Sequence, residues 1–312
     1  LPLSQKNIIT EAKRDDTGGD PGPDDQFGPK SSAAGDKIRN MNSLEKERRL
    51  AERLRGFNSA IVAFSGGVDS SYLAWMAMKE VGGPVLLVTA VSPSTPEIQK
   101  QLVRRFLAKH GGDHRFIETD ELEDERYRSN PPERGYYCKR VILGRIRDIR
   151  GETGAEVLLD GSNADDRHDY RPGARAVDEF GVLSPLAEAG MTKPDIRERS
   201  SALGLETWDL PSMPCLASRI PYGIEITGEA FRMIESAEEF IRSLGIRTFR
   251  VRHHHDLARI EVSAEEFPAF LEGGLMEQVH RRLREIGYQY VTLNLVPFKS
   301  GSLNEAIISI DD

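Results

Sequence analysis

The sequence is poor in cysteine, with 2 in 312 residues, and it has no long hydrophobic run. Two cysteines do not make a disulfide framework and fit a reducing compartment, so we expect a cytoplasmic protein. The longest apolar stretches, such as 85–91, are far too short to span a bilayer. The first residues lack a basic segment followed by an apolar stretch, so we expect no secretory signal and no membrane partner.

Positive charge is also in deficit, because 42 lysines and arginines stand against 50 aspartates and glutamates, for a net charge of -8. Proteins that bind tRNA or DNA usually carry a basic face, since neutralising phosphates supplies most of the affinity. We therefore expect no nucleic-acid partner, although a local basic patch would escape this count. The length allows one large domain or two ordinary ones, with ample core in either case.

Residues 1–43 predict a disordered tail, because 15–36 consists mainly of Gly, Asp, Pro, Lys and Ser. From 44 to 222, short apolar runs alternate with helical patterns, which implies a doubly wound parallel sheet with helices on both faces. Thr95-Pro96-Glu97 predicts the start of a helix, with Thr95 as the capping residue and proline at the first helical position. The predicted strands are 60–64, 85–89, 114–118 and 156–160, and the predicted helices include 71–79 and 139–149.

From 223 to 312 the pattern changes. A long amphipathic helix at 227–244 precedes strand-like segments at 249–252, 259–262 and 290–296. We expect a smaller C-terminal α+β domain that contributes to substrate binding and to contacts between subunits.

The segment Ser65-Gly66-Gly67-Val68-Asp69-Ser70 lies where the first strand meets a helix. A helix N-terminus offers backbone N–H groups and a partial positive charge to an anion. Gly66 and Gly67 let the backbone approach a phosphate closely, while Ser65 and Ser70 add hydroxyl donors. Asp69 can position a metal-bound phosphate or cap the helix. An ordinary glycine turn is the alternative, and the complete hexad at this junction argues against it.

The hexad resembles the PP-loop of the adenine-nucleotide α-hydrolase family and lacks the Gly-Lys-Ser/Thr of a Walker A loop. The resemblance implies a PP-loop (HUP-like) fold, cleavage of ATP between its α- and β-phosphates, and Mg²⁺ as cofactor. It also implies that Thr89, on the second strand, lies near the adenine. The segment 161–166 follows a strand, and we expect Asn163 to contact ATP and Asp165 to join Asp69 in binding the metal. A polar turn is the alternative for this segment.

A proline-stiffened loop, 211–223, displays one cysteine, Cys215, four residues before Arg219. A nearby guanidinium lowers the pKa of a thiol and raises its thiolate fraction. The alternative is a buried cysteine that packs as a small hydrophobe. Pro214 and Pro221 on either side favour an exposed functional loop.

This loop and the hexad together resemble the LarE family, ATP-dependent sacrificial sulfur transferases that help make the nickel-pincer nucleotide cofactor of lactate racemase. The resemblance covers roughly residues 43–305. The other segments that carry it are Asn130-Pro131-Pro132-Glu133-Arg134, Tyr137-Cys138-Lys139, Asp169-Tyr170-Arg171-Pro172-Gly173, Ser184-Pro185-Leu186, Arg250-Val251-Arg252, Ala258-Arg259-Ile260-Glu261-Val262 and Lys299-Ser300-Gly301-Ser302.

The resemblance implies a reaction in which ATP adenylates a carboxylate of pyridinium-3,5-dicarboxylate mononucleotide. The Cys215 thiolate then attacks the activated carbonyl, with Asp69 and Arg219 as the other catalytic residues. Cleavage of the Cβ–S bond leaves dehydroalanine on the protein, so each molecule turns over once. Some relatives carry three cysteines that hold a [4Fe-4S] cluster, but the first of these is Gly135 here. We therefore predict the sacrificial type, with Cys138 a packed thiol.

For the substrate phosphate, the resemblance favours Arg250 and Arg252, which alternate on a strand and face the same side, together with Ser218. A solvated edge strand is the alternative for the two arginines. By a weaker carry-over, Glu238, Glu239 and Glu261 bind a metal or line a subunit interface, and the protein is a homo-oligomer, a hexamer by analogy. His253-His254-His255 cannot converge on a metal from one strand, and we expect them on the surface.

Two other functions stay open at this point. One is a PP-loop tRNA thiolase or a related amidating or thiolating enzyme, which would carry a basic RNA-binding appendage or paired catalytic cysteines. The other is an ATP-binding regulator that has lost its chemistry, against which the intact hexad and Cys215 argue.

Overall fold

The computed structural model describes residues 41–168, 172–299 and 303. The predicted tail up to residue 40 lies outside the described residues, as do the motif positions 169–171 and 300–302. No helix in the described ranges is long and apolar enough to cross a membrane.

The larger part is a parallel sheet in the order β3-β2-β1-β4. Its strands are β1 (Ala60–Ala63), β2 (Val85–Val91), β3 (Asp113–Glu118) and β4 (Val157–Leu159). Successive side chains on a strand point to opposite faces. On β1, Ala60 and Val62 accordingly join one buried cluster and Ile61 joins another. Both faces of this sheet must therefore be covered.

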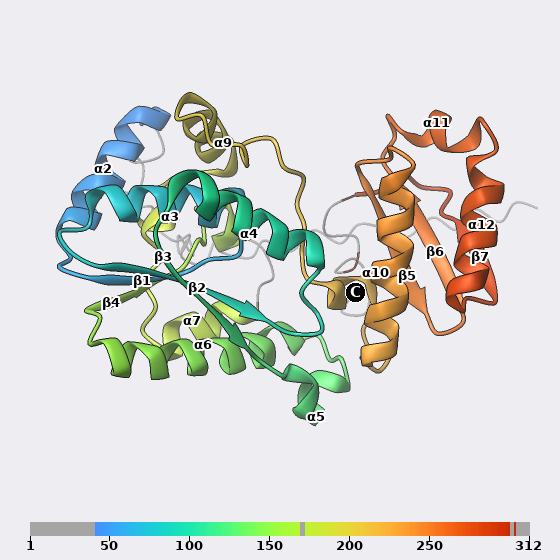
Figure 1. The fold of residues 1–312 in the computed structure, drawn as a ribbon, viewed down its shortest axis with the longest axis horizontal. Coiled ribbons are helices and arrows are strands. Elements are labelled where there is room, and N and C mark those ends of the chain that lie inside the picture. The colour runs from blue at the N-terminus through green and yellow to red at the C-terminus, as the bar shows by residue number, and fades with distance from the viewer. Residues whose placement is uncertain (1–40, 169–171, 300–302, 304–312) are drawn as a thin grey trace, which may run out of the picture.

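Helices cover the two faces as the alternating pattern predicts (Figure 1). On one face lie α2 (Ser43–Arg55), α3 (Val68–Glu80), α4 (Glu97–His110) and α9 (Lys193–Ala202). On the other lie α6 (Arg134–Thr153) and α7 (Gly173–Glu179). The doubly wound parallel fold is confirmed.

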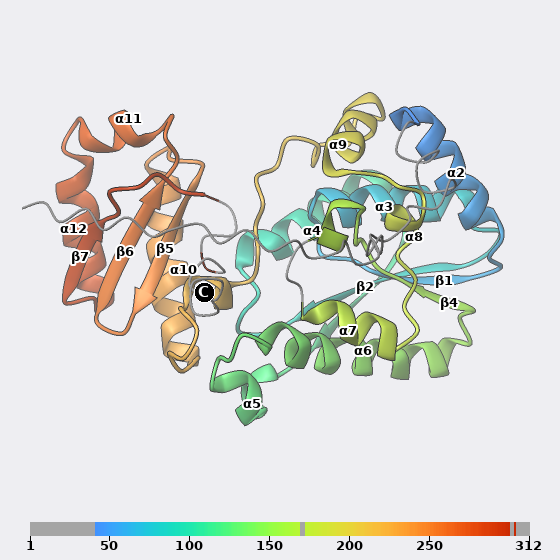
Figure 2. The ribbon, with the colours of Figure 1, turned by 180° about the vertical axis from the view of Figure 1, so that it is seen from behind.

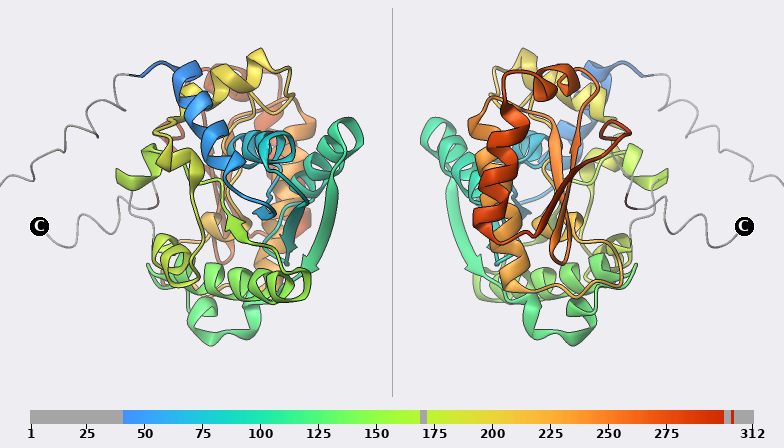
Figure 3. Two further views of the ribbon diagram at one scale, coloured as in Figure 1. Left: turned by 90° about the vertical axis from the view of Figure 1, so that its left-hand side faces the viewer. Right: turned by 90° about the vertical axis from the view of Figure 1, so that its right-hand side faces the viewer.

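The smaller part is a sheet in the order β5-β6-β7, with two helices packed on one face (Figures 2 and 3). Its strands are β5 (Phe249–His254), β6 (Leu257–Val262) and β7 (Tyr290–Leu293). The packed helices are α10 (Gly228–Ser243) and α12 (Leu275–Ile286), and α11 (Phe267–Leu271) precedes α12. The predicted α+β character is confirmed, while the boundary after residue 222 stays a prediction.

Short elements connect these layers. They are η1 (Glu121–Glu123), α5 (Glu125–Arg128), η2 (Asp165–His168), α8 (Pro185–Glu188) and η3 (Leu216–Arg219). The segment between α9 and η3 runs from the larger part to the smaller one (Figure 2). It ends at Cys215, the residue directly before η3.

Two local predictions are wrong. Pro96 is the N-cap of α4 and not its first helical residue, and the Thr95 hydroxyl accepts a hydrogen bond from Ser92 N at 3.1 Å instead of capping the helix. The last strand ends at Leu293 and not at 296; Asn294 N still donates to Ile260 O on β6 at 2.8 Å, but Leu295 beyond it is 94% exposed.

Helix α2 offers a test of how much packing against α3 and α9 stabilises the larger part. Leu50 is fully buried and Leu44, on the same helix, is 41% exposed. We expect Leu50→Ala to lower the free energy of unfolding by about 2–5 kcal/mol, because it leaves a cavity. Leu44→Ala should change it by less than about 0.5 kcal/mol. Urea titration followed by tryptophan fluorescence measures both, and equal effects would contradict the packing described.

Candidate active site

The PP-loop joins β1 to α3 and requires glycine at Gly66. Gly66 has φ of 74°, which side chains rarely adopt, and a Cβ there would lie 3.0 Å from Val103 N and Cγ2. Gly67 is the N-cap of α3. The close approach of α4 to this turn therefore excludes any side chain at Gly66.

Two serines brace the loop from within. Ser70 Oγ accepts from Ser65 N at 3.2 Å, lies 3.0 Å from Ser65 Oγ and donates to Gly67 O at 3.3 Å. These bonds stabilise the conformation of the loop at the N-terminus of α3. At such a position, backbone N–H groups and the helix dipole stabilise an anion.

Lys193, the first residue of α9, contacts both Asp69 and Asp165. Lys193 Nζ lies 2.6 Å from Asp69 Oδ2, and Lys193 N donates to Asp165 Oδ2 at 2.7 Å. Asp69 Oδ1 is buried and has no hydrogen-bond partner within the described residues. An unsatisfied buried carboxylate oxygen is costly, and a bound cation would satisfy it. Asp69 therefore fits Mg²⁺, which prefers oxygen ligands, while Asp165 lines neither of the cavities described below and its part in binding a metal stays a prediction.

Thr89 and Asn163 are turned away from solvent. The Thr89 hydroxyl donates to Phe64 O at 2.6 Å and lies 2.8 Å from His114 Nε2, so it supports the end of β1 and does not line either cavity described below. Asn163 Oδ1 accepts from Asp165 N at 2.9 Å, and its side chain lines the larger cavity. A contact of either side chain with ATP stays a prediction.

Cys215 is exposed and is the N-cap of η3. Leu216 N donates to Ser94 O at 2.9 Å, which ties the loop to the segment after β2. Arg219 Nη1 donates to Pro214 O at 2.7 Å, to Cys215 O at 3.2 Å and to Ser218 Oγ at 2.9 Å. The guanidinium thus holds the backbone that presents the sulfur.

Two buried ion pairs lie beneath this loop. Arg219 Nε and Nη2 each donate to Glu238 at 2.8 Å, and Arg252 Nη2 lies 2.8 Å from Glu261 Oε2. Burial alone would raise the pKa of Glu238, but Arg219 outweighs it and the pKa is lowered, so the carboxylate stays charged. Both glutamates, predicted as metal ligands, are engaged by arginines. In the described residues no group of three or more histidines, cysteines or carboxylates could hold a metal ion.

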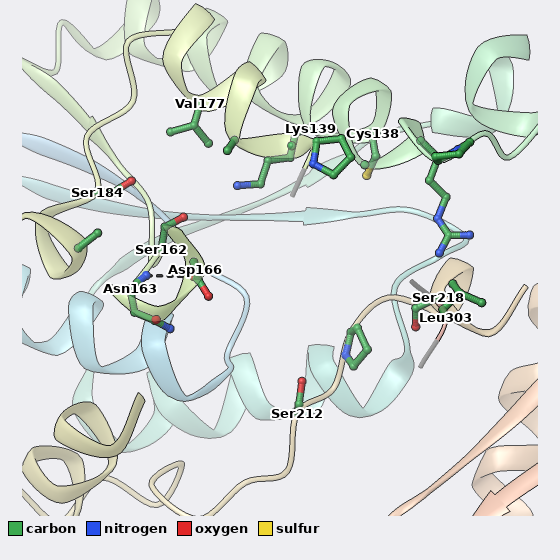
Figure 4. Close-up of a pocket in the computed structure, with 18 of the residues that line it drawn as sticks. Cys138, Lys139, Ser162, Asn163, Asp166, Val177, Ser184, Ser212, Ser218 and Leu303 are labelled. Atoms are coloured by element: carbon green, nitrogen blue, oxygen red, sulfur yellow. Dashed lines mark hydrogen bonds between the residues drawn. The ribbon is translucent and has the colours of Figure 1, made fainter. Parts of the chain in front are cut away.

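Arg250, Arg252 and Ser218 line a cavity of about 750 Å³. Figure 4 shows part of its lining, with Ser218 and Ser212 across from Ser162 and Asn163. Arg250 donates to Phe249 O at 2.6 Å and to Ser212 O, and has no ion pair within the described part of the chain. Burial first, and then the charge of Arg219, lowers the pKa of Arg250 to about 10. An anion bound in the cavity would supply the counter-charge for this buried guanidinium and would stabilise its charged form.

A second cavity, of about 470 Å³, lies over the PP-loop and is lined by Asp69, Lys193 and Cys215 among others. The two cavities share the lining residues Lys139, Ser162, Asp166, Ser212 and Pro214. A nucleotide over the PP-loop and a second molecule beside Arg250 would therefore meet near Cys215.

The other cysteine is packed, as predicted. The Cys138 thiol lies 3.9 Å from Glu121 Oε1, and burial, reinforced by that carboxylate, raises its pKa well above the usual value. A neutral thiol at this position is a poor nucleophile.

The expectation of three surface histidines is wrong for one of them. His253 is 7% exposed, and its Nδ1 lies 3.2 Å from the Tyr288 hydroxyl. Alternation along β5 turns it inward, while His255 is exposed in the turn that follows.

Sequence reasoning assigned no role to Lys193, Lys139 or Asp160. In the sequence, Lys139 is only one residue of the motif Tyr137-Cys138-Lys139. Asp160 comes directly after β4, and a carboxylate that follows a parallel strand is a signal for a site at the carboxyl edge of the sheet.

Known proteins resemble the chain over most of its length, although no protein-family model matches it. It is 35% identical to the pyridinium-3,5-bisthiocarboxylic acid mononucleotide synthase of Lactiplantibacillus plantarum, over 84% of this chain and 95% of that protein. It is 37% identical to an uncharacterized protein of Synechocystis, over 82% of this chain and 97% of the relative. One of the subunits of the glutamine-hydrolyzing GMP synthase of Pyrococcus abyssi is 25% identical, over 66% of this chain and 72% of that relative.

The Arg219–Glu238 pair can be tested against an adjacent residue. Glu238 is 4% exposed, whereas Glu239 is exposed on the same helix. We expect Glu238→Gln to lower the free energy of unfolding by about 3–5 kcal/mol, because it leaves a buried guanidinium without its counter-charge. Glu239→Gln should stay within about 0.5 kcal/mol of the parent. Denaturant unfolding measures both, and an equally stable Glu238→Gln protein would contradict the role given to the pair.

Proposed function

The chain belongs to the LarE family of the PP-loop superfamily, and from this premise we propose that it is an ATP-dependent sacrificial sulfur transferase. Its substrate is pyridinium-3,5-dicarboxylate mononucleotide, and its product is a thiocarboxylate used to make the nickel-pincer nucleotide. The observation that carries this proposal is the exposed Cys215, which lines the PP-loop cavity directly after Pro214, a residue that lines both cavities.

The first step is adenylation of a substrate carboxylate. The N-terminus of α3 and the serines of the PP-loop bind the phosphates of ATP, and pyrophosphate leaves from the α-phosphorus. Asp69 and Asp165 would hold Mg²⁺, which supplies charge neutralisation to the phosphates when bound. Lys193 bridges the same two aspartates and keeps them together.

The substrate phosphate binds at the other end of the large cavity. Arg250 supplies a buried guanidinium with no carboxylate ion pair among the described residues, and Arg252 is oriented by Glu261 and by Ser218 O. Planar guanidinium groups suit phosphate oxygens. Holding the phosphate there places the pyridinium carboxylates toward the PP-loop.

Sulfur transfer follows. The Cys215 thiolate attacks the acyl-adenylate carbon, AMP leaves and a thioester forms. Loss of the Cys215 Cα proton and cleavage of its Cβ–S bond leave dehydroalanine, with the bonding electrons on the sulfur of the thiocarboxylate. Arg219 positions Cys215 through its backbone carbonyl. One protein molecule donates one sulfur.

Intact mass spectrometry tests the sulfur source. After incubation with ATP, Mg²⁺ and the pyridinium substrate, we expect a loss of about 34 Da, one H₂S, because the thiol is the nucleophile that stays with the product. The loss should map to Cys215, disappear in Cys215→Ala and persist in Cys138→Ala. Thiocarboxylate formed over many turnovers at unchanged protein mass would instead require an external sulfur source.

Pyrophosphate release tests the nucleotide assignment separately. We expect Asp69→Ala to abolish it, because the carboxylate that orients the phosphates and their metal is lost. Asp113→Ala, an exposed carboxylate at the start of β3, should release pyrophosphate at the parent rate. Undiminished release from Asp69→Ala would mean that the phosphates bind elsewhere.

A further inference from the structure

The adenylation step of the proposed function brings two anions into contact. A substrate carboxylate must approach the α-phosphate of ATP, and both groups are negatively charged at neutral pH. Coulomb repulsion between two anions opposes this approach, and it is stronger beside protein than in bulk water. A cation is therefore needed at the point where the nucleotide cavity meets the substrate cavity.

Lys139 lies at that point. It is the one basic residue among the described residues that lines both cavities. Its Nζ lies 3.2 Å from Asp160 Oδ2, and its side chain is 40% exposed. Figure 4 shows the Lys139 amine directed toward the side of the cavity that carries Ser162 and Asp166.

The other cations that line the cavities are held elsewhere. Arg134 is buried and donates to Asn130 Oδ1 at 2.6 Å and to Ile220 O at 3.0 Å. Lys193 is paired with Asp69 beside the PP-loop. Arg250 and Arg252 line the larger cavity but not the one over the PP-loop. None of these groups lines both cavities.

Asp160 orients Lys139 without depending on it. Asp160 Oδ1 accepts from Ser184 Oγ at 2.7 Å, and Oδ2 accepts from Ser162 Oγ at 2.7 Å. Ser162 N donates a further bond to Oδ1 at 3.2 Å. Burial would raise the pKa of Asp160, but Lys139 and these hydroxyl groups outweigh it and lower the pKa. The carboxylate keeps its serine partners when the ammonium turns toward a ligand.

The fold also leaves room for the stem of this lysine. A Cβ at Gly173, on α7, would lie 3.0 Å from Lys139 Cδ, so a larger residue there would displace the side chain. Both the head and the stem of Lys139 are thus confined to a path along the wall of the cavity.

We propose that Lys139 is a catalytic residue of the adenylation step. Its ammonium group bridges the attacking carboxylate and the α-phosphate, and it neutralises the charge that builds up on the phosphoryl oxygens as pyrophosphate leaves. No proton transfer is required of it. This proposal rests on the proposed function, because it takes a carboxylate as the group that attacks ATP.

The test measures pyrophosphate release in a Cys215→Ala background, where adenylation is separated from sulfur transfer. We expect Lys139→Met to lower the maximal rate of release about 10²- to 10³-fold, as the loss of one electrostatic contact to a transition state does. The Kd of ATP should change less than about threefold, because the triphosphate is held by the PP-loop. Lys139→Arg should recover part of the rate. Lys109→Met, an exposed lysine remote from both cavities, is the matched control.

The outcomes separate the two claims. A parental maximal rate in Lys139→Met overturns the catalytic role of Lys139. If that rate is unchanged and the Kd of ATP rises, Lys139 only binds the nucleotide, and the proposal is likewise overturned. Failure of the Cys215→Ala parent itself to release pyrophosphate with the pyridinium substrate overturns the proposed function and this inference with it. Circular dichroism of each variant confirms that a loss of rate is not a loss of fold.

Discussion

The geometry of the candidate site depends on one buried ion pair, Arg219–Glu238. Two hydrogen bonds of 2.8 Å join the side chains, and neither is more than 6% exposed. Glu238 belongs to α10 and also accepts from Val251 N on β5, at 3.2 Å. Arg219 in turn holds the carbonyl groups of Pro214 and Cys215. The smaller sheet thereby positions the cysteine that faces the larger one. A buried pair of this kind adds little net stability over an apolar contact, but it defines a single arrangement of the loop.

The charges around the joined cavities are divided in a way that suits two anionic ligands. Asp69, Asp165 and Asp160 lie at the carboxyl edge of the parallel sheet, where Asp69 pairs with the Lys193 ammonium, Asp165 accepts from Lys193 N and Asp160 accepts from Ser184. The arginines lie on the smaller sheet, at the opposite end of the larger cavity. A protein of net charge -8 can still offer cations to a nucleotide and to a second phosphate compound, because Lys139, Lys193, Arg250 and Arg252 line the two cavities.

Much of the fold was predictable from local pattern. Apolar runs of strand length alternate with amphipathic stretches, and only a parallel sheet covered on both faces buries all of them. The PP-loop was predictable for the same reason, since its glycines and hydroxyl groups act within one turn. Where a prediction from the sequence was wrong, a contact with a residue distant in the sequence determined the local structure. Thr95 caps the Ser92 turn and not α4, while Glu97 N, in the first turn of that helix, donates to Glu235 on α10 at 2.7 Å. His253 is buried because Tyr288, 35 residues away in sequence, covers it.

The sequence by itself determined the nucleotide loop, the doubly wound sheet and the identity of the exposed cysteine, because each depends on residues that are neighbours in the chain. The tertiary structure alone decided what the charged residues do. Glu238 and Glu261 are partners of arginines, Lys193 links two aspartates, and Lys139 lines both cavities. Ion pairing depends on distance in space and on burial, and residues that are neighbours in the chain specify neither quantity.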